Sequence, residues 1–158
     1  MQMQDLATSL GGRVRYTRFV IGFKDLQGIP AGAGAQPLTL NSASNPSLAY
    51  TLPSGSKILG VSVKASVAFT GGALTAMTVS LGVTGAVTRF TSAWDIFQAV
   101  GDTVLQETAL FKAGQGSSIA ALIATFTPTT DVVQNCAAGQ LNMDIFWLPM
   151  STTFTEPA

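Results

Sequence analysis

The sequence predicts an all-β protein: an antiparallel β-sandwich of the jelly-roll type, with one short helix near residues 92–100. Three observations support this fold class. Apolar and polar residues alternate with a period of two over residues 59–69 and again over 77–83, which is typical of half-buried antiparallel strands. Turn-forming residues recur at intervals close to the ~8–12 residues expected of sandwiches and barrels. No internal repeat is visible, which argues against a propeller or a solenoid.

The chain length fits a single domain. A chain of 158 residues is long enough to form a core without a disulfide or a metal. Residues 1–12 are polar, end in Gly11-Gly12 and show no sustained period. We therefore expect an N-terminal arm over residues 1–12 and a single β-sandwich domain over residues 13–158. The arm lacks the basic and apolar segments of a signal peptide.

The first half of the domain is expected to hold most of the strands. The alternation in the first strand slips near Phe19, which indicates a β-bulge. Gly71-Gly72 separates the two clearest strands and predicts a turn. The expected elements are a strand over residues 13–26, a Gly- and Pro-rich loop over 27–36, short strands over 37–41 and 47–52, and a hairpin over 58–83. One face of the hairpin's first strand would carry Leu59, Val61, Val63, Ala65, Val67 and Phe69.

The second half contains the expected helix. Ser92 can cap it, Asp95 lies three residues later, where a carboxylate favours a helix N-terminus, and Gly101 suits its end. The rest is expected to be strand or turn. In order, these segments are residues 102–112, whose period is ambiguous and which we assign to a strand; a central strand over 119–126; a weak strand or loop over 131–136; and a last strand over 141–147.

Composition points to a protein that works against other chains. Only 10% of the residues are charged, and the formal net charge is zero, whereas an average globular chain has about 25% charged residues. Small polar residues must therefore cover much of the surface, and other subunits must cover part of it. The basic residues lie toward the N-terminus and the acidic residues toward the C-terminus, which suits contacts between neighbouring subunits but also arises by chance with so few charges.

Residue types needed for catalysis are scarce. The sequence has no histidine, which removes the Ser-His-Asp and Cys-His arrangements and most zinc sites. Cys136 is the single cysteine, so it has no internal disulfide partner, and a small buried side chain is the better interpretation. The acidic residues show no paired or metal-binding spacing. We therefore predict a protein that is not an enzyme and needs no cofactor or metal.

The sequence does not favour a membrane or a nucleic acid as a partner. Residues 65–88 are uncharged, but polar residues alternate through them and Gly71-Gly72 interrupts them, so no membrane span is expected. Residues 13–18 interleave basic and aromatic side chains, as nucleic-acid binders do, but a neutral chain favours charged subunit contacts instead. Four aromatic residues form a candidate sugar-binding set, although core or interface positions are commoner for them. They are Tyr16, Tyr50, Trp94 and Trp147.

Two regions carry a resemblance to a known group of proteins. The first is GSKILGVSVKASVAFTGG at residues 55–72, followed by MTVSLG at 77–82. The second is IAALIATFTP at 119–128, followed by AGQLNMDIFWLP at 138–149. Together they resemble small virion proteins of tailed bacteriophages, over roughly residues 55–149.

The resemblance implies a non-enzymatic jelly-roll protein of the virion, assembled in the host cytoplasm. The implied role is a capsid decoration or cement protein that stabilises the phage head. Its partners would be the major capsid protein or other virion proteins, and it would form a homo-oligomer, for which a trimer is one expected form. The alternatives are a receptor- or glycan-binding module of a tail or fibre, or another minor virion component.

The expected partner contacts lie in the arm, in the first strand and in the loop over residues 27–36. Polar segments of this kind can become ordered on binding, and the arginines can meet acidic partners. The candidate contact residues are Arg13, Arg15, Tyr16, Arg18, Ile29 and Pro30.

Overall fold

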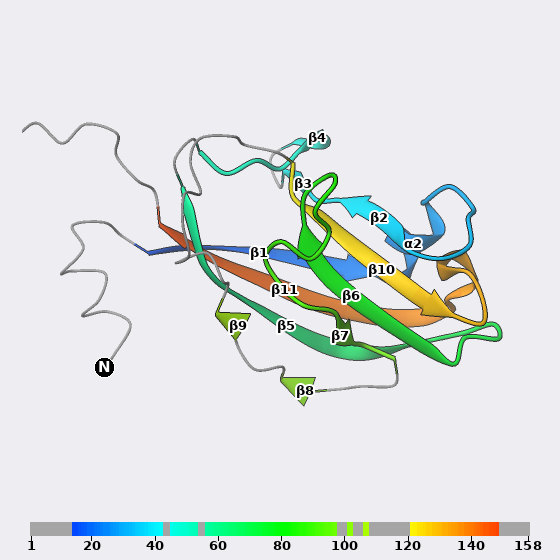
Figure 1. The fold of residues 1–158 in the computed structure, drawn as a ribbon. Coiled ribbons are helices and arrows are strands. Elements are labelled where there is room, and N and C mark those ends of the chain that lie inside the picture. Colours follow the sequence, from blue (N-terminus) through cyan, green and yellow to red (C-terminus); the bar gives the residue numbers. More distant parts are fainter. Residues whose placement is uncertain are drawn as a thin grey trace, which may run out of the picture.

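The fold is described by a computed structural model over residues 14–42, 45–53, 56–97, 101–102, 106–107 and 121–148. The expected arm, Arg13 and most of the segment over residues 102–112 lie outside these ranges. Two sheets pack face to face, and Figure 1 shows them as two layers. None of the helices in the described ranges has the length and hydropathy needed to cross a bilayer.

The two layers are a five-stranded sheet, sheet A, and a four-stranded sheet, sheet B. In spatial order, sheet A contains β1 (Arg15–Gly22), β11 (Ala138–Leu148), β5 (Lys57–Thr70) and β8 (Gly101–Asp102), and β9 (Gln106–Glu107) also pairs with β5. Sheet B contains β2 (Gln36–Thr39), β10 (Ile123–Thr129), β6 (Ala76–Gly82) and β7 (Trp94–Asp95). A small ribbon joins β3 (Asn41–Ser42) to β4 (Asn45–Ala49).

The strand order is that of a jelly roll. Numbered along the chain, the strands of the two main sheets, without β9, follow the order 1-8-3-6 in sheet A and 2-7-4-5 in sheet B. Successive strands thus alternate between layers, except that β6 and β7 are neighbours in sheet B, and this order is that of two Greek keys wrapped into a sandwich. The predicted all-β jelly-roll sandwich is confirmed, and the strand after residue 119 is central in its sheet, as predicted.

The core lies between the two sheets. The inward residues of β5 and β11 meet those of β6 and β10, and the rings of Phe69 and Phe126 approach to 6.2 Å between centroids. Burying each such side chain contributes roughly 1.5–3 kcal/mol. The fully buried residues include Val61, Val63, Met77, Val79, Leu81, Ala124, Phe126, Leu141, Met143 and Ile145.

The predicted hairpin over residues 58–83 is wrong, although both of its strands exist. β5 belongs to sheet A and β6 to sheet B, so the turn carries the chain from one layer to the other. Gly71 and Gly72 have φ values of 142° and 54°, which favour glycine. The amide of Ala137 donates to the carbonyl of Thr70 at 2.8 Å and anchors this turn. Alternation shows which face of a strand is buried, but it does not identify the neighbouring strand.

The β-bulges lie in β5 and not in β1. All eight residues of β1 pair with β11 without a register shift, so the bulge predicted near Phe19 is wrong. The pairing of β5 with β11 shifts register three times. These shifts turn Val67 outward, where 46% of it is exposed, and leave Leu59 half-buried. The predicted inward face therefore holds for Val61, Val63 and Ala65 and resumes at Phe69.

The helix predicted near residues 92–100 is also wrong over its described part, residues 92–97. β7 pairs with Thr78 and Val79 of β6. The carboxylate of Asp95 accepts a hydrogen bond from the amide of Phe97 at 2.9 Å, so this acid stabilises a local turn. The amide of Ile96 donates to Met77 in sheet B at 2.9 Å. Tertiary pairing therefore overrides the helical pattern.

The helices in the described residues occur elsewhere. The first strand stops at Gly22, and α2 (Phe23–Gln27) follows. The carboxylate of Asp25 accepts a hydrogen bond from the amide of Gly22 at 2.7 Å, which stabilises the first turn, and Leu26 is fully buried. The weak strand or loop expected over residues 131–136 contains the short 3-10 helix η2 (Val133–Asn135).

Candidate interaction surface

The outer face of sheet B is covered by the chain itself. Within the connection from β6 to β7, residues 83–91 fold back over this face (Figure 1). Ser80 and Thr125 point outward from their strands and yet are only 5% and 4% exposed. The hydroxyl of Ser80 donates to the carbonyl of Val87 at 3.0 Å. A Cβ atom on Gly82 would lie 2.1 Å from the carbonyl oxygen of Ala86, so the connection packs directly on a glycine.

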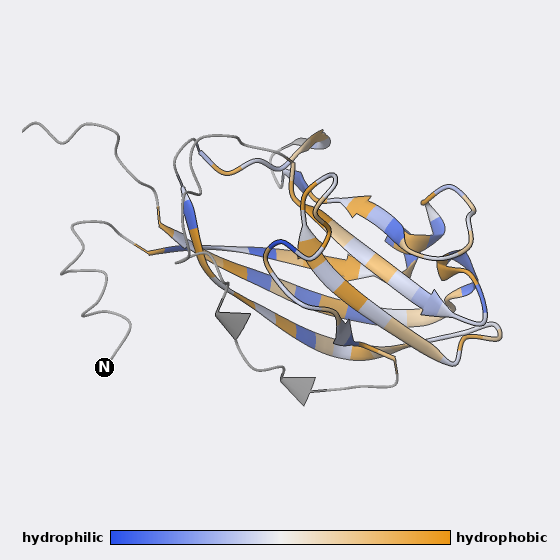
Figure 2. Cartoon of the chain, in the orientation of Figure 1, coloured by the Kyte–Doolittle hydropathy of each residue, from blue (hydrophilic) through white to orange (hydrophobic). Residues whose placement is uncertain are grey.

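The outer face of sheet A has no such cover within the described ranges. Tyr16, Val20 and Val67 lie on it and are 63%, 56% and 46% exposed. Figure 2 shows how apolar and polar residues alternate along β1, β11 and β5. We call this surface the sheet A face. The register and the burial pattern place these residues on it: Tyr16, Arg18, Val20, Ser62, Lys64, Val67, Asn142, Asp144 and Phe146.

The centre of the sheet A face carries an ion pair. Arg18 donates from Nε and Nη2 to the two carboxylate oxygens of Asp144 at 2.7 and 2.8 Å. The hydrogen bond and the charge of Asp144 raise the pKa of Arg18. The two charges neutralise each other within the chain, so Arg18 adds little net charge to this surface. An exposed pair of this kind contributes little stability, but its bidentate geometry fixes the position of the guanidinium.

Aromatic contacts surround the first residues of β1. The rings of Tyr16 and Phe146 lie 6.3 Å apart between centroids. On the opposite side of the strand, Arg15 lies over the ring of Trp147 at 5.6 Å. The indole N–H of Trp147 donates to the hydroxyl of Thr17 at 3.2 Å. Arg15 and Tyr16 therefore point to opposite faces, and only Tyr16 belongs to the sheet A face.

Of the two predicted contact residues in the loop, Ile29 is buried and Pro30 is exposed. Ile29 is 9% exposed and packs in the core, so little of its side chain is left for a partner. Pro30 is exposed, and its carbonyl accepts a hydrogen bond from Nε2 of Gln134 at 2.8 Å. This contact fixes the start of the loop against η2. Of the candidate contact residues, the sheet A face brings together Tyr16 and Arg18.

Sequence reasoning missed the two valines of this surface. Val20 and Val67 were assigned to strands without a solvent-facing role. A signal was present for Val20, because Tyr16, Arg18 and Val20 are spaced by two and must share a face in an unbulged strand. No comparable signal exists for Val67, because a bulge in β5 turns it outward.

The titratable residues Cys136 and Asp131 take part in structural contacts. The described residues contain no cluster of three potential metal ligands. Burial raises the pKa of the Cys136 thiol, which keeps it protonated and unreactive. Asp131 accepts hydrogen bonds from the amides of Ala73 and Val132 and from Asn135, and these lower its pKa. This carboxylate therefore ties the turn after β5 to the turn after β10.

The four aromatic residues of the candidate sugar-binding set do not share an exposed face. Tyr16 is exposed, Trp147 is buried, and Tyr50 and Trp94 pack against the core. The hydroxyl of Tyr50 is hydrogen-bonded to Thr17 at 2.8 Å. Tyr50, Trp94 and Trp147 therefore support the sandwich, whereas Tyr16 lies on the sheet A face.

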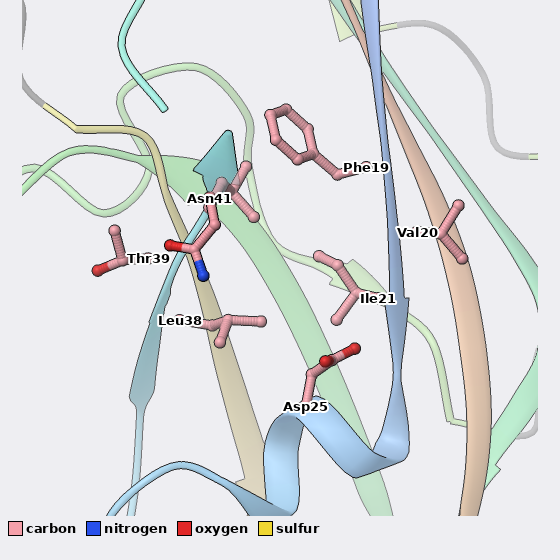
Figure 3. Close-up of a pocket in the computed structure, with 8 residues that line it drawn as sticks. Phe19, Val20, Ile21, Asp25, Leu38, Thr39 and Asn41 are labelled. Carbon is pink, nitrogen blue, oxygen red and sulfur yellow. The ribbon is translucent and has the colours of Figure 1, made fainter. Parts of the chain in front are cut away.

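A hollow opens between β1 and β2, at one lateral side of the sandwich. Phe19 and Ile21 point from β1 toward β2, whereas Val20 points to the other side of the strand (Figure 3). Leu38 and Leu40 line the hollow from β2 and the residue after it, and Asp25 adds a carboxylate. Thr39 and Asn41 complete the lining. The hollow thus combines an apolar floor with polar groups.

Comparisons with known proteins identify fold relatives only. No protein-family model matches the chain, and no curated protein matches it either. A chain in the capsid asymmetric unit of cyanophage Pam1 is 18% identical, with a TM-score of 0.54 over 88% of this chain and 86% of that chain. A chain in the capsid of Ralstonia phage GP4 is 18% identical, with a TM-score of 0.49 over the same shares. At this identity, the likeness to the Pam1 chain shows that the two share a fold.

Proposed function

We propose that this protein is a non-enzymatic structural component of a bacteriophage virion, and that it decorates or cements the capsid. The observation that carries this proposal is the fold likeness to a chain of the Pam1 capsid asymmetric unit, which extends over 88% of this chain. The scarcity of catalytic residue types supports it, because the sequence has no histidine and a single, buried cysteine.

The sheet A face is the proposed capsid contact. It presents exposed apolar side chains around a neutralised ion pair, and apolar patches on soluble proteins commonly mark interaction sites. The sheet A face extends across β1, β11 and β5, and a surface of this width suits one side of an interface that buries about 1,600 Å² in total. The major capsid protein is the proposed partner. We further propose that the decorating unit is a homo-oligomer, a trimer being the expected form, which light scattering can test.

The test is binding to heads of the encoding phage that were assembled without this protein. The purified chain should co-sediment with these heads. Val20→Glu together with Val67→Glu should weaken binding at least about tenfold, because each change buries a carboxylate at the contact. Val87→Glu is the matched control, since Val87 is 43% exposed but lies on the cover of sheet B.

The outcomes separate the two parts of the proposal. Heads that bind none of the proteins would overturn the capsid function. Heads that bind the double variant as well as the wild-type chain would leave the function standing and exclude the sheet A face as the contact. Far-ultraviolet circular dichroism should show the same β-sheet spectrum for all variants.

A further inference from the structure

One edge of β1 is open. In the described part of the chain, β1 pairs with β11 on one side and with no strand on the other. Its eight residues contain no proline and pair with β11 without a bulge, so two devices that commonly protect an edge strand are missing from it. The amides and carbonyls along this edge can therefore bond to another strand.

The arginines of β1 do not guard the open edge. Charged side chains on an edge strand commonly prevent pairing with other chains. Arg18, however, is held by Asp144, its partner on β11. Arg15 likewise lies over the ring of Trp147, its own partner on β11. Both charges are therefore drawn toward β11 and away from the open edge.

The opposite side of the sandwich shows what fits between the two sheets. There, the amide of Ile96 donates to the carbonyl of Met77 in sheet B at 2.9 Å, and the carbonyl of Ile96 accepts from the amide of Phe69 in sheet A at 3.3 Å. Ile96 is only 1% exposed. A short segment thus bonds through its backbone and buries one side chain. No described segment does the same on the side of β1 and β2.

The hollow of Figure 3 lies beside the open edge and provides room for a side chain. Phe19 and Ile21 line it from β1, and Leu38 and Leu40 line it from β2 and the residue after it. Its volume of about 160 Å³ is below the ~300–1,000 Å³ of most small-molecule sites and well above the space that one water needs. One long side chain therefore suits the hollow better than a cofactor-sized ligand.

Asp25 gives the hollow a negative charge. Within the described ranges, one oxygen of its carboxylate accepts from the amide of Gly22 at 2.7 Å, and the carboxylate forms no ion pair. Lys24 is not part of the lining. An apolar floor that ends at a carboxylate suits a lysine, whose methylene stem packs while its ammonium group meets the acid. An arginine would need both oxygens for its bidentate geometry.

We propose that the open edge of β1 and the hollow form a strand-addition site, at which an extended segment of another protein pairs with β1 and inserts a lysine beside Asp25. In strand addition, backbone hydrogen bonds provide affinity and pockets for alternate side chains provide specificity. Alternate side chains of the added strand would point to the same side as Phe19 and Ile21. The site lies beside the sheet A face and not on it, so this inference does not depend on capsid binding through that face.

The peptide acetyl-Thr-Val-Thr-Lys-Thr-Val-Thr-amide is the probe, titrated into the full-length chain and followed by NMR. At saturation, the alternate amides of β1 that do not bond to β11 should exchange at least about tenfold more slowly. Replacing the lysine of the peptide by glutamate should weaken binding at least about tenfold, because two carboxylates would then meet. This comparison needs no change in the protein.

Asp25→Asn tests the same contact from the side of the protein. Its amide oxygen can still accept from Gly22, so the turn is kept while the charge is lost, and the lysine peptide should bind about three- to fivefold more weakly. Asp95→Asn is the matched control, because Asp95 is also exposed and accepts from an amide, that of Phe97 at 2.9 Å. It should leave binding unchanged.

Three results would overturn the proposal. The first is the absence of any effect of the lysine peptide on the β1 amides. The second is equal binding of the lysine and glutamate peptides, or an effect of Asp25→Asn no larger than that of Asp95→Asn. The third is slow exchange of the same β1 amides without peptide. Loss of that protection on about hundredfold dilution would identify a second copy as the occupant, and its persistence would identify the chain itself.

Discussion

The two outer faces of the sandwich are built on the same alternation but differ in what covers them. On sheet B, the outward residues Ser80 and Thr125 are buried, and the hydroxyl of Ser80 donates to the carbonyl of Val87 in the loop over residues 83–91. On sheet A, the outward residues Tyr16 and Val20 are more than half exposed. The chain therefore covers the outer face of sheet B with its own loop, whereas no described segment covers the outer face of sheet A.

The chemistry of the two faces follows from this difference. Sheet B presents small or polar residues beneath the loop, including Gly82, where a backbone carbonyl packs directly on the glycine. Sheet A presents valines and a tyrosine around an ion pair. Small residues permit close packing within the chain, whereas larger apolar side chains at the surface supply area for contact with another molecule.

The largest effect is expected from a change beneath the loop. Gly82→Ala places a Cβ atom against the carbonyl of Ala86 and the backbone of Val87. Because backbone cannot yield as a flexible side chain can, the loop must lift, and we expect the free energy of unfolding to fall by about 3 kcal/mol. Urea denaturation measures this change.

Gly85→Ala is the control for the loss of glycine alone. Gly85 has φ of 79°, and a Cβ atom there would meet no atom within 4 Å, so only the strain of the left-handed conformation remains, about 1 kcal/mol. If Gly82→Ala cost no more than Gly85→Ala, the close cover of sheet B would not exist in solution.

A second effect, expected to be smaller, concerns the hydrogen bond that anchors the loop. The hydroxyl of Thr91 accepts a hydrogen bond from the amide of Leu81 at 2.8 Å, and Thr91 is 3% exposed. Thr91→Val keeps the shape but leaves a buried amide without its partner, so the free energy of unfolding should fall by about 2 kcal/mol. Thr127→Val, at an exposed position of β10, should change it by less than about 0.5 kcal/mol. Equal effects of the two changes in urea denaturation would contradict the anchoring role.

Local pattern was enough to predict the layers of the fold. Alternation identified the inward residues Val61 and Val63 of β5, and apolar residues on both faces marked the strand after residue 119 as central. What the pattern did not contain was pairing. The turn at Gly71-Gly72 passes between sheets, and the Ser92–Asp95 spacing gave way to strand pairing with β6. Both outcomes depend on contacts distant in sequence.

The candidate surface was only partly predictable for a related reason. Tyr16 and Arg18 were expected contacts, and they lie together because β1 is unbulged. Ile29 was expected at a partner contact, but the turn after α2 places it in the core. Exposure on a sheet depends on what covers the face, and single-strand alternation does not contain that information.

The smallest effect is expected on the sheet A face itself. Val67→Thr replaces a methyl group by a hydroxyl group at a position 46% exposed, so the free energy of unfolding should change by less than about 0.5 kcal/mol. Val63 lies in the same strand and is fully buried, so Val63→Thr should cost about 2 kcal/mol, because its hydroxyl lacks a partner in the core. Denaturation at two protein concentrations measures both. A loss for Val67→Thr that matched the loss for Val63→Thr, and grew with protein concentration, would show that another copy covers this face, because only a contact between chains depends on concentration.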